Sequence, residues 1–314
     1  MNIKKHLSTI KFIFLTSMGF LLILTTNISA AEFPAAGWHR GDVSSAQENS
    51  RNAIIKALNS SSPNIEVDIM DFFDSFGKRT GILAHDYNME RIAGSKGNFI
   101  DNHDISTLPN NSANSELSPE PYLTVIELFD IIKQSKERGS TPFVSLDMKE
   151  EGDTGEAFGV WIGNLIKEYN FQDHVFASSF FKNNVVGVEK SCSECLTGGL
   201  VFNDHWALKN LDYHHTSLDI TTLGKMTFFM GFLGKEEFPH DFVLIQDDII
   251  FEHPEITDYW RNERKVKFVG VFVYQTERPY TEKEWGILEN IDWIELDPPQ
   301  MDQYIQNKKT NKSK

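Results

Sequence analysis

Eight short apolar runs rich in β-branched residues recur along this chain, and most are followed by a segment with helical periodicity. The strand-like runs lie near residues 35–39, 65–69, 143–147, 174–178, 199–202, 242–246, 267–273 and 292–295. The helical patterns lie near 47–58, 122–137, 155–168, 182–189, 254–263 and 281–289. Eight strands alternating with helices are typical of an α/β chain that closes as a (β/α)8 TIM barrel rather than an open sheet. Two long stretches, 71–121 and 203–241, interrupt the alternation and are predicted to be insertions.

The first 31 residues have the features of a secretory signal peptide. Three lysines precede an apolar stretch that runs from Phe12 to about Leu24, and small residues follow at Ser29, Ala30 and Ala31. An uncleaved membrane anchor is the alternative, although the apolar stretch is short for a membrane span. We therefore expect a signal peptide over 1–31, a barrel domain over 32–306 and a polar tail over 307–314. Export would place the protein in the periplasm or outside the cell, with no stable membrane span after cleavage.

The formal net charge of −15 argues against polyanionic partners. Signal cleavage would remove three lysines and no acid, which moves the charge to about −18. Such a chain is repelled by nucleic acid and by anionic membrane surfaces, so we expect no nucleic-acid partner. A local group of basic side chains can still bind a phosphate ester.

Cys192 and Cys195 are the two cysteines of the chain and have C-x-x-C spacing. In an exported protein this spacing favours a local disulfide. A free dithiol with a thioredoxin-like redox role is the alternative. A zinc site would need more ligands than this pair supplies.

Charged residues stand at i and i+2 within two of the apolar runs. Glu66 and Asp68 lie in one run, and Asp147 and Lys149 end another. Residues two apart in a strand point to the same face, and buried charges are costly unless they are paired or bound to a metal ion. Carboxylate oxygens are the ligands that Ca²⁺ and Mg²⁺ prefer. We therefore predict one divalent cation, Ca²⁺ or Mg²⁺, held by Glu66, Asp68 and Asp147, with salt bridges as the alternative.

Two histidines end strand-like runs, where barrel enzymes place their catalytic groups. His39 and His85 are candidates for general acid and base because imidazole titrates near neutral pH. Arg40 and Lys149 are candidates for binding phosphate oxygens. Pairing with the nearby carboxylates is the alternative role, and the two roles are compatible.

Taken together, these motifs resemble the glycerophosphodiester phosphodiesterase family. They follow the order of that family across most of the mature chain: His39-Arg40-Gly41, Glu48-Asn49-Ser50, Ile65-Glu66-Val67-Asp68, His85-Asp86, Asp147-Met148-Lys149 and Ile291-Asp292-Trp293-Ile294-Glu295-Leu296-Asp297-Pro298. The resemblance implies a TIM barrel with a small insertion after the second strand.

The resemblance also implies a role for each site residue. His39 and His85 would be the acid/base pair, and Glu66, Asp68 and Asp147 would hold one divalent cation. Arg40 and Lys149 would contact the phosphate, while Glu48 would support the first loop. The expected enzyme hydrolyses a small-molecule glycerophosphodiester to glycerol 3-phosphate and an alcohol, through attack by the glycerol 2-hydroxyl and a cyclic phosphate.

One departure from the family pattern concerns the substrate. Asp147 stands where the hydrolytic family usually has Glu, which resembles the related sphingomyelinase D and phospholipase D branch. A lysophospholipase D or sphingomyelinase D-like enzyme acting on lipids is therefore the first alternative. The aromatic run 228–233 would then contact lipid, unless it forms a buried strand. A non-catalytic binding protein on the same barrel is the second alternative.

Overall fold

The computed structural model describes residues 35–99, 104–150, 154–201, 241–274 and 278–311. The predicted signal peptide and the aromatic run 228–233 lie outside these ranges, as does almost all of the predicted insertion 203–241. Within the described ranges, no helix combines the length and the apolar character needed to cross a bilayer.

Eight parallel strands form a closed barrel, as the alternation predicted. Neighbouring strands follow the order β1-β9-β8-β7-β6-β5-β4-β2, and β1 also pairs with β2, which closes the ring. The eight strands are β1 (Ala35–Trp38), β2 (Asn64–Met70), β4 (Val144–Met148), β5 (Val175–Ser179), β6 (Leu196–Val201), β7 (Phe242–Gln246), β8 (Phe268–Phe272) and β9 (Trp293–Leu296). Each contains or overlaps one of the predicted runs. The fold is therefore a (β/α)8 TIM barrel.

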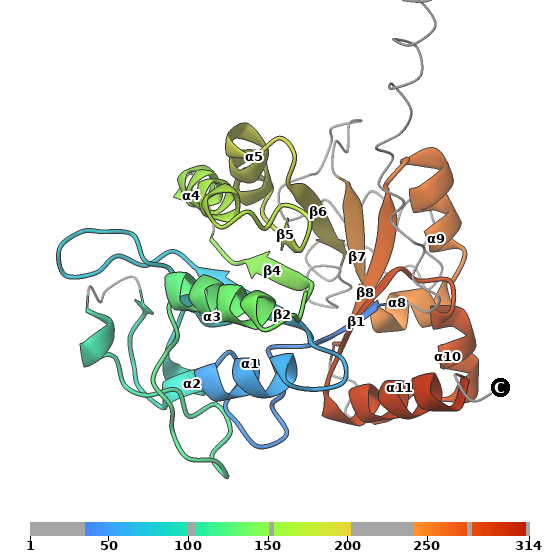
Figure 1. Cartoon of the computed structure of the whole chain (residues 1–314), viewed down its shortest axis with the longest axis horizontal. Coiled ribbons are helices and arrows are strands. Elements are labelled where there is room, and N and C mark those ends of the chain that lie inside the picture. The colour runs from blue at the N-terminus through green and yellow to red at the C-terminus, as the bar shows by residue number, and fades with distance from the viewer. Residues whose placement is uncertain (1–34, 100–103, 151–153, 202–240, 275–277, 312–314) are drawn as a thin grey trace, which may run out of the picture. The chain divides into compact units, whose positions relative to one another are not determined.

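Helices lie on the outside of the strands (Figure 1). They are α1 (Arg51–Leu58), α3 (Val125–Glu137), α4 (Thr154–Glu168), α5 (Lys182–Ser191), α8 (Asp247–Glu252), α9 (Ile256–Asp258) with the π-helical turn η3 (Tyr259–Glu263), α10 (Glu282–Leu288) and α11 (Pro298–Asn311). Thr124 and Thr281 begin α3 and α10 with capping boxes, because each side chain accepts from the third helical N–H. Helix α11 extends through residue 311, so the first part of the predicted polar tail is helical.

Large aromatic rings fill the interior of the barrel. Phe176 on β5 and Trp293 on β9 meet with ring centroids 4.9 Å apart, although their strands are not neighbours. Glycine makes room for these rings: a Cβ added to Gly37 would lie 2.5 Å from the Trp293 ring, and one added to Gly198 would lie 2.3 Å from the Phe242 ring. The interior is therefore packed solid below the carboxyl ends of the strands.

The segment after β2 forms the insertion that the family resemblance implied. It contains the short strand β3 (Ile82–Leu83), which pairs antiparallel with β2, the helix α2 (Glu90–Ala93) and the 3-10 turn η2 (Ile105–Thr107). A small apolar cluster of its own packs it against the end of β2. The buried members of this cluster are Met70, Phe72, Ile82, Ala84, Met89, Ile92, Phe99, Leu108 and Tyr122. The insertion is thus anchored beside the carboxyl end of the barrel.

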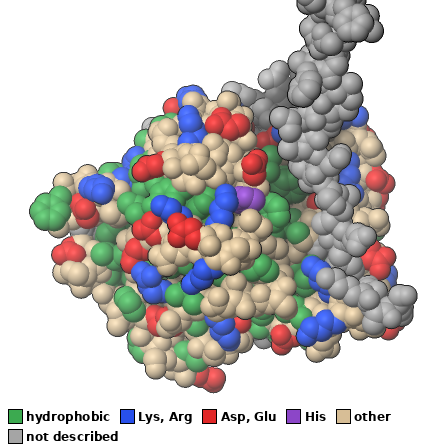
Figure 2. Space-filling model, in the orientation of Figure 1, with side chains coloured by type: hydrophobic (Ala, Val, Ile, Leu, Met, Phe, Trp, Pro, Cys, Tyr) green, Lys and Arg blue, Asp and Glu red, His purple; other side chains and the backbone are tan. Residues whose placement is uncertain are grey.

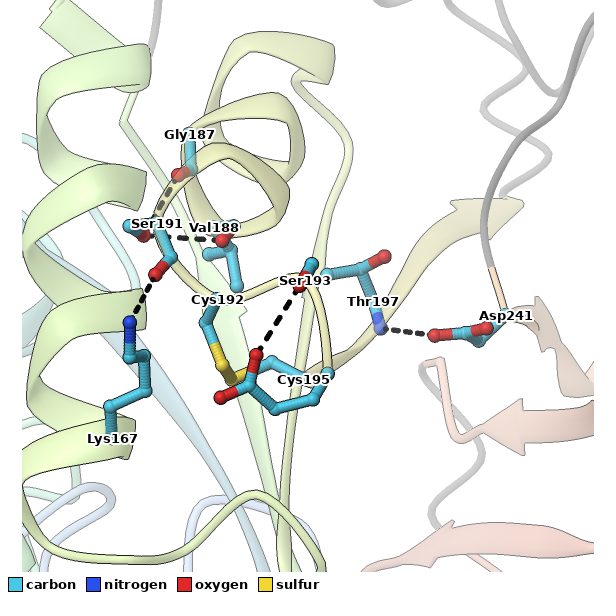
Figure 3. Close-up of a disulfide and its surroundings, with 10 residues drawn as sticks. Lys167, Gly187, Val188, Ser191, Cys192, Ser193, Cys195, Thr197 and Asp241 are labelled. Carbon is cyan, nitrogen blue, oxygen red and sulfur yellow. Dashed lines mark hydrogen bonds between the residues drawn. A yellow bond between two sulfur atoms is a disulfide. The ribbon is translucent and has the colours of Figure 1, made fainter.

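Cys192 and Cys195 form a disulfide, which confirms the first of the two states predicted from their spacing (Figure 3). Both cysteines are buried, and the pair closes the turn between α5 and β6. Lys167 of α4 donates to the carbonyl oxygen of Ser191 at 3.0 Å, just before the turn. The disulfide therefore links the end of α5 to the start of β6 within the main apolar core.

Candidate active site

All seven predicted site residues line one cavity of about 940 Å³ at the carboxyl ends of the strands. His39 and Arg40 follow β1, Glu66 and Asp68 lie on β2, and His85 follows β3. Asp147 and Lys149 lie at the end of β4. On the face of the molecule shown in Figure 2, acidic and basic side chains lie next to one another with a histidine beside them. The cavity brings together groups that are far apart in the sequence.

Three carboxylates form the deepest charged group of the cavity. Parallel pairing places Asp68 opposite Asp147, and Glu66 lies two residues before Asp68 on the same face. One oxygen from each of Glu66, Asp68 and Asp147 lies within 4.8 Å of the others, and all three side chains are buried. Asp147 Oδ1 is buried without a hydrogen-bond partner. A buried carboxylate oxygen without a partner, beside two more carboxylates, fits the oxygen ligand set of a hard divalent cation.

The pKa values of these carboxyl groups are moved in different directions. Burial raises the pKa of Glu66 well above its usual range, and the charges of Asp68 and Glu295 add to this. Burial also raises the pKa of Asp147. Burial acts in the same direction on Asp68, but Lys149 and Arg40 outweigh it and hold the pKa of Asp68 well below its usual range. Burial therefore disfavours the ionised form of Glu66 and of Asp147, and a bound cation would offset that cost.

Both basic side chains pair with the carboxylates, as one of the sequence interpretations allowed. Lys149 Nζ contacts Asp147 Oδ2 and lies 2.9 Å from Asp68 Oδ1. Arg40 Nε lies 3.1 Å from Asp68 Oδ2, and Arg40 Nη1 donates to Glu48 Oε2 at 3.1 Å. Burial opposes the charge on both groups, yet the surrounding carboxylates raise the pKa of each. Both remain cationic and border the cavity, so they are also able to receive a phosphate group.

The backbone of Arg40 is part of the site as well. Its φ of 58° lies in the left-handed region, which is uncommon for a residue with a side chain. In this conformation the N–H of Arg40 donates to Glu66 Oε2 at 2.9 Å. Strain of this kind persists where surrounding contacts fix the backbone, and it is frequent at functional sites.

Each predicted catalytic histidine is held by a carboxylate through Nδ1. His39 Nδ1 lies 2.9 Å from Asp297 Oδ1, and His85 Nδ1 lies 2.5 Å from Asp86 Oδ1. A carboxylate at Nδ1 favours the tautomer in which that nitrogen carries the hydrogen. The Nε2 nitrogen is then the one that exchanges protons with a ligand. For His39 this nitrogen lies 3.9 Å from Glu66 Oε2, beside the carboxylate group.

The sequence assigned no role to several residues that shape the site. Asn49 is buried, donates to Asp68 Oδ2 at 2.8 Å and accepts from the Asp68 N–H at 3.1 Å. Its φ of 55° is a conformation that asparagine tolerates better than most residues. Asp297 and Glu295 belong to the motif near the end of the chain, and membership of that motif could have marked them as site residues. No motif or spacing in the sequence pointed to Arg91, which lies on the insertion.

Glu295 is a fourth buried carboxyl group in the cavity. It lies on β9, accepts from Trp293 Nε1 at 3.1 Å, and is 2 % exposed. Burial raises its pKa from the ordinary 4.5 to about 7. This carboxyl is therefore protonated over part of the pH range in which a free one would be ionised.

This shift predicts how stability depends on pH. Because the pKa of Glu295 is higher in the folded protein, the contribution of this group to the free energy of unfolding of the metal-free protein should fall as pH rises from about 4.5 to 7. For Glu295 the expected loss is about 3 kcal/mol. The Glu295→Gln variant should equal the wild type below pH 4.5 and exceed it by about that amount above pH 7. Urea unfolding at several pH values, with chelator present, measures the difference; a gap that does not change with pH would contradict it.

The opposite wall of the cavity is apolar. Phe180, Phe181, Leu200, Phe272 and Tyr274 line it, from the ends of β5, β6 and β8. The Phe180 ring also lies near the charged group, with its centroid 5.7 Å from Lys149 Nζ. The cavity thus has a charged side for a phosphate and an apolar side for a less polar substituent.

No protein-family model matches this sequence, and no curated protein sequence matches it. Solved structures do match the fold. A glycerophosphodiester phosphodiesterase from Parabacteroides distasonis aligns over 89% of this chain and 99% of its own, with 15% identity and a TM-score of 0.57. One from Agrobacterium tumefaciens aligns over 85% of this chain and 98% of its own, with 15% identity and a TM-score of 0.56.

A third similar structure contains a ligand. The phosphodiesterase of Oleispira antarctica, solved with its product sn-glycerol 3-phosphate, aligns over 88% of this chain and 97% of its own. Its identity is 17% and its TM-score is 0.60. The chain has the fold of the glycerophosphodiester phosphodiesterases. This agrees with the family resemblance of the motifs.

Proposed function

We propose that this protein is a metal-dependent phosphodiesterase that hydrolyses glycerophosphodiesters to glycerol 3-phosphate and an alcohol. The observation that carries the proposal is the composition of one cavity. Two carboxylate-held imidazoles, a buried lysine, a partly buried arginine and three clustered carboxylates line it together. The structural similarity to a phosphodiesterase with bound sn-glycerol 3-phosphate supports the same substrate class.

In the proposed reaction the two histidines move protons. One takes the proton of the glycerol 2-hydroxyl as that oxygen attacks phosphorus, and the other protonates the oxygen of the leaving alcohol. The two histidines then exchange roles: one takes a proton from the water that attacks the cyclic phosphate, and the other returns a proton to the 2-oxygen as its bond to phosphorus breaks. Asp297 and Asp86 hold His39 and His85 in the tautomer that this exchange needs.

The charged side chains bind and orient the phosphate. Arg40 and Lys149 are held by the carboxylates and contribute positive charge to the phosphate oxygens, whose negative charge changes in the transition state. Glu66, Asp68 and Asp147 would hold one divalent cation, Ca²⁺ or Mg²⁺. When bound, such a cation supplies Lewis-acid polarisation of the phosphate.

Metal dependence gives the direct test. Mature protein should release choline and glycerol 3-phosphate from glycerophosphocholine when Ca²⁺ or Mg²⁺ is present. Exhaustive chelation should abolish the release, and added cation should restore it. An enzymatic choline assay, with each ion and with chelator, follows the reaction. Activity that survives chelation would refute the metal assignment, and a folded protein with no turnover would favour a binding role.

A lipid substrate is the second candidate, and the apolar wall of the cavity favours it. Phe180, Leu200, Phe272 and Tyr274 offer a surface that an acyl chain is able to cover, whereas a deacylated glycerophosphodiester has no comparable apolar group. Asp147 also favours a lipid substrate, because it stands where the glycerophosphodiester phosphodiesterases usually have the longer Glu and the lipid-cleaving branch has Asp. Comparing kcat/KM for glycerophosphocholine and lysophosphatidylcholine separates the two candidates, because the better substrate identifies the class.

We also propose that the mature protein begins near residue 32 and functions outside the cytoplasm. The disulfide supports this, because such bonds persist in oxidising compartments. N-terminal sequencing of protein recovered from the periplasm or medium of an expressing cell tests the proposal, since an intact Met1 would refute cleavage.

A further inference from the structure

Arg91 brings the insertion into the candidate site. It belongs to the short helix α2, and its side chain lines the cavity with the seven predicted residues. Its Nη2 and Nη1 donate to the two oxygens of Glu48 at 2.6 and 3.1 Å. Its Nε donates to Asp86 Oδ2. One guanidinium group is thus shared between two carboxylates that come from different loops.

Each of these carboxylates holds a residue of the proposed machinery. Asp86 uses its other oxygen to hold His85 Nδ1 at 2.5 Å. Glu48 Oε2 also accepts from Arg40 Nη1 at 3.1 Å. A continuous chain of contacts therefore runs from His85 through Asp86, Arg91 and Glu48 to Arg40.

The charge of Arg91 is less important than its shape. The side chain is 44% exposed, and exposed ion pairs contribute little to stability. A planar guanidinium, however, engages two oxygens at once in a fixed geometry, which a lysine ammonium cannot reproduce. Burial tends to raise the pKa of Glu48, but Arg40 and Arg91 lower it, so Glu48 remains an anion between two cations.

We propose that Arg91 is a positioning residue that fixes His85 relative to Arg40 and so sets the spacing between proton transfer and phosphate binding. The inference rests on the proposed function, because it assigns His85 and Arg40 the roles given there. It also gives the insertion a task in catalysis, since α2 carries Arg91 to the site.

The test compares Arg91→Gln and Arg91→Lys with a matched control. Arg278 makes the same bidentate contact with Glu284, since its Nη1 and Nη2 donate to the two carboxylate oxygens at 2.9 and 2.6 Å, but it does not line the cavity. Arg278→Gln therefore removes an equivalent ion pair away from the site. Asp86→Ala and the double variant Asp86→Ala/Arg91→Gln complete the set. The measurements are kcat and KM for glycerophosphocholine with Mg²⁺, and the affinity for inorganic phosphate by calorimetry.

We expect Arg91→Gln to lower kcat by about 10–100-fold and to weaken phosphate binding several-fold, while Arg278→Gln changes neither. Arg91→Lys should recover only part of the loss. In the Asp86→Ala background, Arg91→Gln should lower kcat by less than about 3-fold, because the route to His85 is already broken, and should still weaken phosphate binding through Glu48.

Two results would overturn the inference. One is full additivity of the Asp86 and Arg91 substitutions in kcat, and the other is an Arg91→Gln variant that behaves like Arg278→Gln. If the wild type does not hydrolyse glycerophosphocholine, the proposed function fails, and the positioning role of Arg91 is then tested by phosphate affinity alone. Unchanged affinity in both Arg91 variants would then refute the positioning role. Thermal unfolding of each variant identifies loss of folding, in which case Arg91→Lys serves as the decisive variant.

Discussion

Replacing His39 or His85 by glutamine is expected to lower kcat by about 10²–10⁴-fold, the usual contribution of general acid–base catalysis. Glutamine keeps a polar group of similar size next to Asp297 or Asp86, so the surroundings of each histidine should persist. It cannot exchange a proton near neutral pH, and the reaction loses that step. Divalent-cation affinity should stay largely intact, because neither histidine belongs to the carboxylate group.

A third histidine provides the control. His253 also lies beside a carboxylate, with Nδ1 3.5 Å from Glu255 Oε1, but it does not line the cavity. The His253→Gln variant should retain wild-type kcat. Steady-state kinetics and cation titration by calorimetry give both quantities for all three variants. Full activity in either the His39 or the His85 variant would show that the proton-transfer assignment is wrong.

The Glu66→Gln variant is expected to change cation affinity and stability in opposite directions. Loss of a ligand should weaken divalent-cation binding by more than about 100-fold, since even residues that only support ligands account for 10–100-fold. Activity should fall with it. The metal-free protein, in contrast, should become more stable, because a buried carboxylate close to Asp68 and Glu295 is replaced by a neutral amide. The amide oxygen is still able to accept from the Arg40 N–H.

The pH dependence fixes the sign of the stability effect. The pKa of Glu66 is raised in the folded protein, so its ionisation costs stability at pH values above the ordinary 4.5. The advantage of Glu66→Gln should therefore grow as pH rises from that value. Glu48→Gln should do the reverse and destabilise at neutral pH, because the pKa of Glu48 is lowered in the folded protein. Thermal unfolding with chelator measures both, and a destabilised Glu66→Gln protein would refute the electrostatic account.

The sequence predicted the barrel and the charged residues for a shared reason. Apolar runs report strands directly, and the i, i+2 spacing of Glu66 with Asp68 places both carboxylates on one face whatever surrounds them. Their position at the ends of strand-like runs made His39 and His85 candidates for acid and base, and the resemblance to a known family implied the same roles. The apolar runs and the i, i+2 spacing depend on neighbours in sequence, so a single chain was sufficient to find them.

Contacts between distant loops were not predictable in the same way. Arg91 reaches Glu48 across 43 positions, and Asn49 reaches Asp68 across 19. No local pattern reports such pairs. Helix α11 was missed for another reason: it begins at two prolines and is mostly polar, and its buried side chains Met301 and Tyr304 give a weak helical pattern. Proline is nevertheless acceptable in the first turn of a helix.

In the part of the chain that the structure describes, the ring-filled interior closes the barrel below the charged group, so the cavity opens at the carboxyl ends of the strands. Trp293, Phe176 and Phe242 block passage beneath the charged group, and the glycines opposite them allow the rings to fit without a gap. Whatever is made in the cavity must then depart by the same opening through which the next substrate arrives. Under the proposed function, glycerol 3-phosphate and the intact diester would pass through the same opening and compete for the same phosphate position in the cavity. The enzyme would therefore be inhibited by its own product, and its rate of hydrolysis would depend on the concentration of glycerol 3-phosphate in its surroundings.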